Sequence, residues 1–227
     1  PMAMTDKVDL KAEHQASLHR PRYPYTLLPR LFYVGMDLFA GKETTLSKAK
    51  LLEIFAGVPY RAWELRHYRR MTRRYADAAV VTQARDIVSW TREAQDNEWW
   101  HLYAINEKMK ADSVKDAWYL TPPLPALMMA VYWIIVRVMA ALSMRRAFLF
   151  NAQFEDHAEH NYAHFVADHP ELDAEPVAGA AVRAYGNFAS WGDVFRRICL
   201  DEREHMNRSF TLAGRSEQVV APVSAET

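Results

Sequence analysis

The chain has 227 residues, half of them apolar, which is enough for one globular domain with a sizeable core. Its 28 basic and 28 acidic residues cancel, so no overall positive charge points to nucleic acid as a partner. Only seven glycines favour long helices over a turn-rich β fold, and the single cysteine, Cys199, excludes an internal disulfide. We therefore expect an all-α protein that does not bind nucleic acid.

The two ends of the chain differ from the part between them. Residues 1–20 are polar and of mixed charge, and residues 214–227 begin with a glycine and are mostly polar. Both read as segments without a packed structure, because chain ends need specific contacts to become ordered. We predict a flexible arm over 1–20, one domain over 21–213 and a disordered tail over 214–227.

Two segments are apolar enough to contact a membrane. Residues 21–41 are aromatic and apolar and read as an amphipathic or interfacial helix from about Leu27, although a helix packed on the core fits equally well. Residues 124–144 are the most hydrophobic, but the uninterrupted apolar run is only 13 residues long before Arg137. Spanning a bilayer takes about 20 residues. A helix in the membrane interface or in the core is therefore favoured over a spanning helix.

Four long helices are predicted, over residues 46–74, 78–111, 145–168 and 191–213, with a short one over 176–185. Thr44 or Thr45 and Ser190 are suitable N-caps for the first and the last of the long helices.

The sequence Glu98-Trp99-Trp100-His101 has a spacing that recurs at Glu202 and His205. Residues three apart lie on one face of a helix, one turn apart, so a carboxylate and an imidazole can converge on one metal ion. Glu98 and His101 also lie on the apolar stripe of their helix, where an uncompensated charge is costly.

The other two long helices each carry a glutamate at a suitable place, Glu53 and Glu155. Two lone glutamates and two Glu-x-x-His pairs, one set per helix, are the ligands of a carboxylate-bridged di-iron centre in a ferritin-like four-helix bundle. The sequence therefore predicts this fold, with additional interfacial helices. The six predicted metal ligands are Glu53, Glu98, His101, Glu155, Glu202 and His205.

Further candidates lie close to Glu155 in the sequence. Tyr162 is two turns along the same helix face, and Ala158 between them leaves room for the phenol to lie near a metal. His157, His160 and His164 form an alternative metal motif, but they lie on a different face. We interpret these three histidines as a solvated polar surface.

Four stretches resemble the alternative oxidase family, most closely its plastid terminal oxidase and bacterial branch. They are LEIFAGVPY over 52–60, NEWWH over 97–101, the segment 154–162 and DEREH over 201–205. The resemblance covers about residues 22–214.

Membership of this family implies a monotopic membrane protein that oxidises quinol and reduces O2 to water without pumping protons. The resemblance implies two iron ions as cofactors, ubiquinol or plastoquinol and O2 as substrates, and possible homodimers. It also implies association with one leaflet of a membrane, for which we expect the cytoplasmic face of a bacterial inner membrane.

The resemblance assigns further roles by position. Tyr162 matches the family's redox-active tyrosine, and Asn97 and Asp201 match residues that orient the metal ligands by hydrogen bonds. The expected quinol contacts are Lys48, Leu52, Glu53, Ala158 and Asn161.

The chain departs from the family pattern at three of these places. His157 stands where the family has a carboxylate, Asn161 where a Thr or Ser is common, and Lys48 where mitochondrial members have an arginine. These departures bear on quinone preference and leave the metal ligands intact.

Two other functions use the same ligand set. A different di-iron oxygenase or desaturase would need a reductase partner in place of quinol. A ferritin-like iron-binding bundle would be no enzyme. Neither requires the apolar segments to contact a membrane, so membrane partitioning separates them from a quinol oxidase.

Overall fold

The computed structural model describes residues 8–223, and all secondary structure in that range is helical, so the all-α prediction is confirmed. The chain divides into two compact units. Unit 2 is residues 45–147, and unit 1 combines the chain up to Thr44 with the chain from Phe148 onward.

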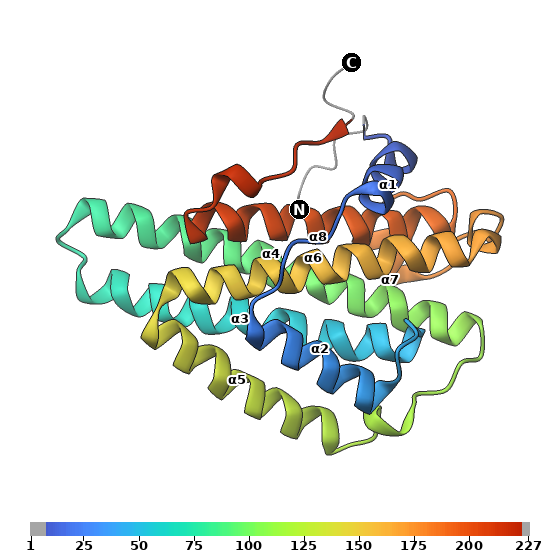
Figure 1. Cartoon of the computed structure of the whole chain (residues 1–227), viewed down its shortest axis with the longest axis horizontal. Coiled ribbons are helices and arrows are strands. Elements are labelled where there is room, and N and C mark those ends of the chain that lie inside the picture. Colours follow the sequence, from blue (N-terminus) through green and yellow to red (C-terminus); the bar gives the residue numbers. More distant parts are fainter. Residues whose placement is uncertain (1–7, 224–227) are drawn as a thin grey trace. The chain divides into compact units, whose positions relative to one another are not determined.

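Unit 2 is built on a long helical hairpin, with α3 over Leu46–Arg73 and α4 over Ala78–Ala111. Figure 1 shows the two helices running antiparallel. The Thr45 hydroxyl accepts a hydrogen bond from the backbone N–H of Lys48, and Asp77 caps α4 in the same way at Val80. Both predicted helices are confirmed, with Thr45 as the N-cap.

The third helix of unit 2 is α5, Leu124–Leu142, which follows the short 3-10 helix η1, Trp118–Leu120. It packs along α3, where the rings of Phe55 and Tyr132 meet edge to face with centroids 5.7 Å apart. Its buried residues recur every four positions, at Tyr132, Val136 and Ala140. The rest of its surface is exposed and largely apolar.

By length and composition α5 could cross a membrane, and it is the one helix among residues 8–223 that meets this test. The helix has 19 residues because it continues past Arg137, which lies on its exposed side. Contact with a membrane is therefore possible for α5, while its leaflet and its depth stay predictions.

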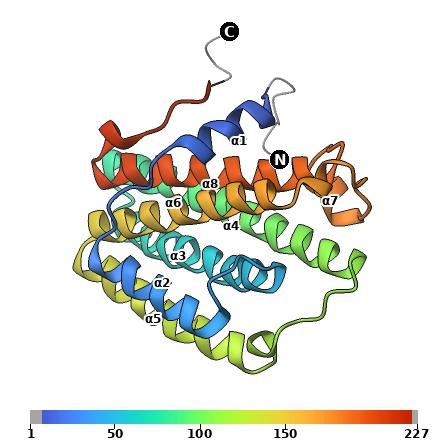
Figure 2. The same cartoon turned by 45° about the vertical axis from the view of Figure 1, so that its right-hand side comes forward.

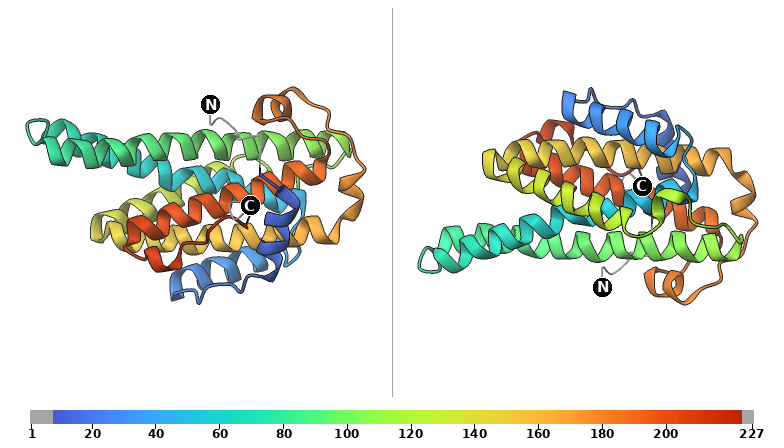
Figure 3. Two further views of the ribbon diagram at one scale, coloured as in Figure 1. Left: turned by 90° about the horizontal axis from the view of Figure 1, so that it is seen from above. Right: turned by 90° about the horizontal axis from the view of Figure 1, so that it is seen from below.

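Unit 1 is built on α8, Trp191–Ala213, and on α6, Met144–Asp168, which belongs to this unit from Phe148 onward. The two helices lie side by side (Figures 2 and 3), and Ala152, Met206 and Phe210 form part of their shared core. Ser190 caps α8 as predicted, and Gly214 ends it in the left-handed conformation at φ 73°.

Two short elements lie between α6 and α8 in the sequence. After the 3-10 helix η2, Pro170–Asp173, the helix α7 covers Ala180–Tyr185. It begins four residues later than predicted, because Gly179 just before it has a φ of 146°, which no helix accommodates.

The prediction of a flexible arm is wrong for α1, Leu10–His19, which packs on α8. The Arg203 guanidinium donates to Glu13 Oε2 at 2.5 Å and to Glu159 Oε1 at 2.9 Å. Arg20, just after α1, contacts Glu159 Oε2 and Asp156 Oδ1, both at 2.6 Å. We call these five side chains the buried ion network. It holds α1 in place, and only residues 1–7 of the predicted arm lie outside the described range.

The prediction of a disordered tail over 214–227 is also wrong for the first part of that segment. The 3-10 helix η3, Ser216–Gln218, follows α8, and the Asn207 side chain makes two hydrogen bonds of 2.8 Å with the backbone N–H and C=O of Val220. The Tyr23 hydroxyl donates to the Gln218 carbonyl. Residues 224–227 lie outside the described range.

The remaining helix of unit 1, α2, covers Leu27–Ala40 and confirms the helix predicted there. Tyr33 anchors one face by donating to the Gln153 carbonyl at 2.8 Å and by stacking on the His157 ring. The opposite face is exposed and apolar, at Leu27, Leu28, Leu31, Val34 and Leu38. The helix is amphipathic, and its contact with a membrane stays a prediction.

Replacing Arg203 by Leu tests the buried ion network. The change removes the Arg203 cation from the buried carboxylates of Glu13 and Glu159, of which Glu159 keeps its contact with Arg20, and loss of one member of a buried ion pair costs about 3–5 kcal/mol. We expect the free energy of unfolding, measured by urea titration, to fall by that amount, with a change below about 0.5 kcal/mol for the control Arg208→Leu on the same helix. Equal effects of the two substitutions would contradict this role of Arg203.

Candidate metal centre

Within unit 2, Glu53 of α3 meets Glu98 and His101 of α4. His101 Nδ1 lies 3.4 Å from Glu53 Oε2 and 3.4 Å from Glu98 Oε2. The three residues are at most 5% exposed, and each offers a ligand atom within 4.8 Å of the others. We call them the α3–α4 triad.

The sequence places the triad through the periodicity of α4. Glu98 and His101 lie on the stripe of α4 that also buries Ala94 and Ile105, at steps of three and four residues. On α3, Glu53 lies between the buried Leu51 and Phe55. Because these helices pack closely over most of their length, the two carboxylates and the imidazole meet in the interior.

Within unit 1, a second triad has the same composition. Glu155 comes from α6, and Glu202 and His205 come from α8, with His205 Nδ1 3.6 Å from Glu202 Oε2. All three are buried and offer ligand atoms within 4.8 Å of one another. Asn151, one turn before Glu155, donates to Glu155 Oε1 at 2.9 Å and fixes that carboxylate. We call these residues the α6–α8 triad.

The donor chemistry of both triads suits a divalent metal. Each contains two carboxylates and one imidazole, so each carries a net charge of −2 with a neutral imidazole and −1 with a protonated one. Burying that charge is costly unless a cation compensates it. Carboxylate oxygen and imidazole nitrogen are ligands that iron accepts. The buried Glu–His clusters can therefore hold a metal ion, and all six predicted ligands belong to them.

The residues predicted to support the ligands have clear positions. Tyr162 is buried on α6, with its ring stacked on Phe195 at a centroid distance of 6.3 Å. Asp201, next to Glu202, pairs with Arg197 and accepts a 2.5 Å hydrogen bond from the Tyr185 hydroxyl of α7. Arg197 and Tyr185 were not predicted, and the one local signal for them is the i, i+4 spacing of Arg197 and Asp201. On α4, Asn97 is half-buried.

The interpretation of the three α6 histidines as a solvated surface is wrong for His160. Its ring nitrogens lie 2.7 Å and 2.8 Å from the carbonyl oxygens of Asp156 and Arg20. His157 is half-buried against Tyr33, and only His164 is exposed. The chain after α1 covers this face of α6, so His160 stabilises that packing.

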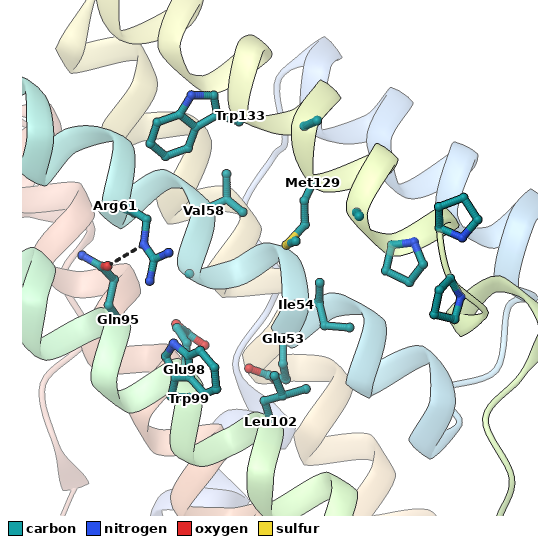
Figure 4. A pocket seen from close by; sticks show the side chains of 16 residues that line it. Glu53, Ile54, Val58, Arg61, Gln95, Glu98, Trp99, Leu102, Met129 and Trp133 are labelled. Carbon is teal, nitrogen blue, oxygen red and sulfur yellow. Dashed lines mark hydrogen bonds between the residues drawn. The ribbon is translucent and has the colours of Figure 1, made fainter.

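The predicted quinol contacts are spread over α3 and α6. Lys48 is buried and Leu52 half-buried on α3, while Ala158 and Asn161 are half-buried on α6. Arg22 donates to Asn161 Oδ1 at 3.4 Å. Of the five predicted residues, Glu53 lines a cavity of about 720 Å³ inside unit 2 (Figure 4). Arg61 and Gln95, which also line this cavity, were not predicted as site residues from the sequence.

Compared with known proteins, the chain matches no family model and no curated protein. The resemblance to the alternative oxidases therefore rests on the four sequence stretches and stays a prediction. The helical fold of residues 8–223 and the buried Glu–His clusters do not depend on that resemblance.

The two triads make a prediction about metal content. If Glu98 is a ligand, Glu98→Gln removes an anionic donor and lowers the iron bound per chain, as measured by elemental analysis of purified protein. Its matched control is Glu93→Gln, an exposed glutamate on the same helix, which should bind as much iron as the unchanged chain. Removing iron with a chelator should also lower the melting temperature, because metal bound to the folded state stabilises it. Protein free of metal, with a melting temperature that added Fe(II) leaves unchanged, would show that the triads are only ion clusters.

Proposed function

We propose that the protein is a quinol:oxygen oxidoreductase of the alternative oxidase type, which passes electrons from a membrane quinol to O2. Both triads would be ligands of one carboxylate-bridged iron pair in a ferritin-like four-helix arrangement of α3, α4, α6 and α8. The observation that carries the proposal is the repeated composition of the triads, each with one lone Glu and one Glu-x-x-His pair, all six buried. This is the ligand inventory of a di-iron carboxylate site.

Iron held by the six ligands would relay electrons from quinol to O2, with two quinols supplying the four electrons and four protons that convert one O2 to two waters. The protein's part is to hold the six ligands and to keep the site dry, which the burial of every ligand supports. We propose that the Glu53 carboxylate, which lines the cavity of unit 2, accepts a proton released by quinol. A buried phenol at Tyr162 is suited to give up a proton and an electron together. Lys48, Leu52, Ala158 and Asn161 stay predicted quinol contacts.

A membrane-soluble electron donor fits the exposed apolar surfaces. Exposed large apolar side chains occupy much of α5 in unit 2, and five of them lie along one face of α2 in unit 1. Solvent-exposed apolar faces of this kind mark membrane or protein contacts. We propose that the chain associates with one leaflet through these helices, at the cytoplasmic face of a bacterial inner membrane. Homodimer formation is part of the same proposal.

The proposal predicts quinol-dependent O2 uptake that cyanide does not inhibit. Vesicles carrying the protein should consume O2 when given a short-chain ubiquinol or plastoquinol, and Glu98→Ala should abolish the uptake because it removes a ligand. The control Glu93→Ala should retain the rate.

Two results would contradict this function. Two irons per chain without quinol-driven uptake would favour an oxygenase that takes electrons from a reductase. A protein that stays out of membranes and is inert toward quinol would favour an iron-binding bundle.

Tyr162→Phe tests the tyrosine. The phenylalanine keeps the ring that packs on Phe195 but cannot give up a proton, so turnover should fall about 100-fold while bound iron stays the same. Tyr103→Phe on the exposed side of α4 is the matched control and should leave turnover unchanged. A Tyr162→Phe variant with full turnover would show that the phenol takes no part in the reaction.

A further inference from the structure

The C-terminal part of α3 concentrates positive charge in a chain whose basic and acidic residues cancel overall. Residues 65–86, where α3 turns back into α4, contain six arginines and only two acidic residues, Asp77 and Asp86. Four of the arginines are exposed and follow one another closely on α3, at positions Arg66, Arg69, Arg70 and Arg73. We call these four residues the arginine stripe.

The chain does not neutralise the arginine stripe itself. The neighbouring Arg74 pairs with Asp77 at 3.1 Å, but within residues 8–223 no carboxylate lies at ion-pair distance from the four stripe arginines. Glu64, the acidic residue before the stripe on α3, already accepts from Arg92 at 2.7 Å and from Gln95 at 2.9 Å. The stripe therefore differs from the buried ion network, because its guanidinium groups are available to an anion outside the chain.

The arginine stripe lies on the face of α3 that packs against α5. Phe55 marks this face, because its ring meets the ring of Tyr132 on α5. Arg66 and Arg73 follow Phe55 by about three and about five helical turns, and the other two stripe arginines lie within about 60° of that line. Figures 1 and 3 show that the α3–α4 hairpin projects beyond the C-terminal end of α5. Past that end, the face that α5 covers earlier on α3 continues as the stripe.

Next to this charge, α5 exposes an apolar surface that carries no negative charge. Its exposed apolar side chains include Leu127, Val131, Ile134, Val138 and Leu142. The sequence has no acidic residue between Asp116 and Glu155, whereas the arginines at 137, 145 and 146 are exposed. Beside the stripe on α3, Leu65 and Tyr68 are 42% and 47% exposed. Apolar and aromatic side chains among basic ones are typical of a surface that lies at the membrane interface.

We propose that the arginine stripe binds the headgroups of anionic phospholipids where α5 contacts a membrane. The proposal rests on the membrane association in the proposed function and names its lipid partner. A guanidinium group suits a phosphodiester, because its paired donors match two phosphate oxygens. An acidic protein would balance the charge of the stripe but would not account for the apolar surface of α5 beside it. An anionic bilayer accounts for both, with acyl chains against α5 and phosphates against the stripe.

Flotation of the iron-loaded protein with lipid vesicles measures this binding without turnover. Vesicles of phosphatidylcholine alone are compared with vesicles in which a third of the lipid is phosphatidylglycerol. Each basic residue close to an anionic surface strengthens binding about fivefold. The double variant Arg69→Gln, Arg73→Gln should therefore bind the phosphatidylglycerol vesicles about 25-fold more weakly and the phosphatidylcholine vesicles as the unchanged chain does. The matched control, Arg183→Gln with Arg215→Gln, removes two exposed arginines of unit 1 and should keep the preference for phosphatidylglycerol.

The other two arginines of the stripe give an independent variant. Arg66→Gln with Arg70→Gln should weaken binding to phosphatidylglycerol vesicles to a similar extent, and both pairs should fold normally because the four side chains are exposed. Salt tests the same point in the unchanged chain. At about 1 M NaCl the Debye length falls to about 3 Å, so the two kinds of vesicle should bind equally.

The outcomes separate this inference from the proposed function. Quinol-driven O2 uptake with equal binding to the two kinds of vesicle, or with a phosphatidylglycerol preference that both stripe variants retain, would overturn the inference alone. A preference that both stripe variants lose, in a protein without quinol-driven uptake, would support the inference and overturn the function. Absence of vesicle binding, with retention on immobilised polyglutamate that the stripe variants lose, would overturn the inference in favour of an acidic protein partner.

Discussion

The burial of carboxylates inside helix pairs is the constraint on which the rest of the structure depends. In the buried ion network the chain itself supplies the cations, because Arg20 and Arg203 contact Glu13, Asp156 and Glu159. Each triad has two carboxylates and only one imidazole, whose positive charge can balance at most one of them. A metal ion bound there would balance the remainder and, unlike an arginine, it can leave coordination positions open to a substrate.

Most of the fold follows from local sequence patterns. The bounds of α3, α4 and α8 and the caps at Thr45 and Ser190 could be predicted, because apolar periodicity and capping side chains act within a few residues. The Glu-x-x-His pair of each triad could be predicted in the same way, since three-residue spacing on a helix brings a carboxylate and an imidazole together.

What could not be predicted depends on contacts between distant residues. The polar sequence of α1 resembles a solvated arm, but Glu13 is buried by Arg203, 190 positions later. The burial of His160 could not be predicted for the same reason, because its hydrogen-bond partner, the Arg20 carbonyl, lies on another segment. The cavity of unit 2 could not be predicted from the sequence either. Small residues such as Gly57 and Ala130 line it, and their place around a cavity follows only from the packing of α5 along α3.

The proposed function joins these features through one claim, that six ligands hold a single coupled pair of irons. Mössbauer spectroscopy of ⁵⁷Fe-loaded protein tests it most directly, since irons bridged by carboxylates influence each other's spin. The account predicts two irons per chain whose oxidised form is antiferromagnetically coupled and has a diamagnetic ground state. Loss of iron coupling should follow from Glu53→Gln in one triad and from Glu155→Gln in the other. Two magnetically independent irons, or one iron per chain, would contradict the account.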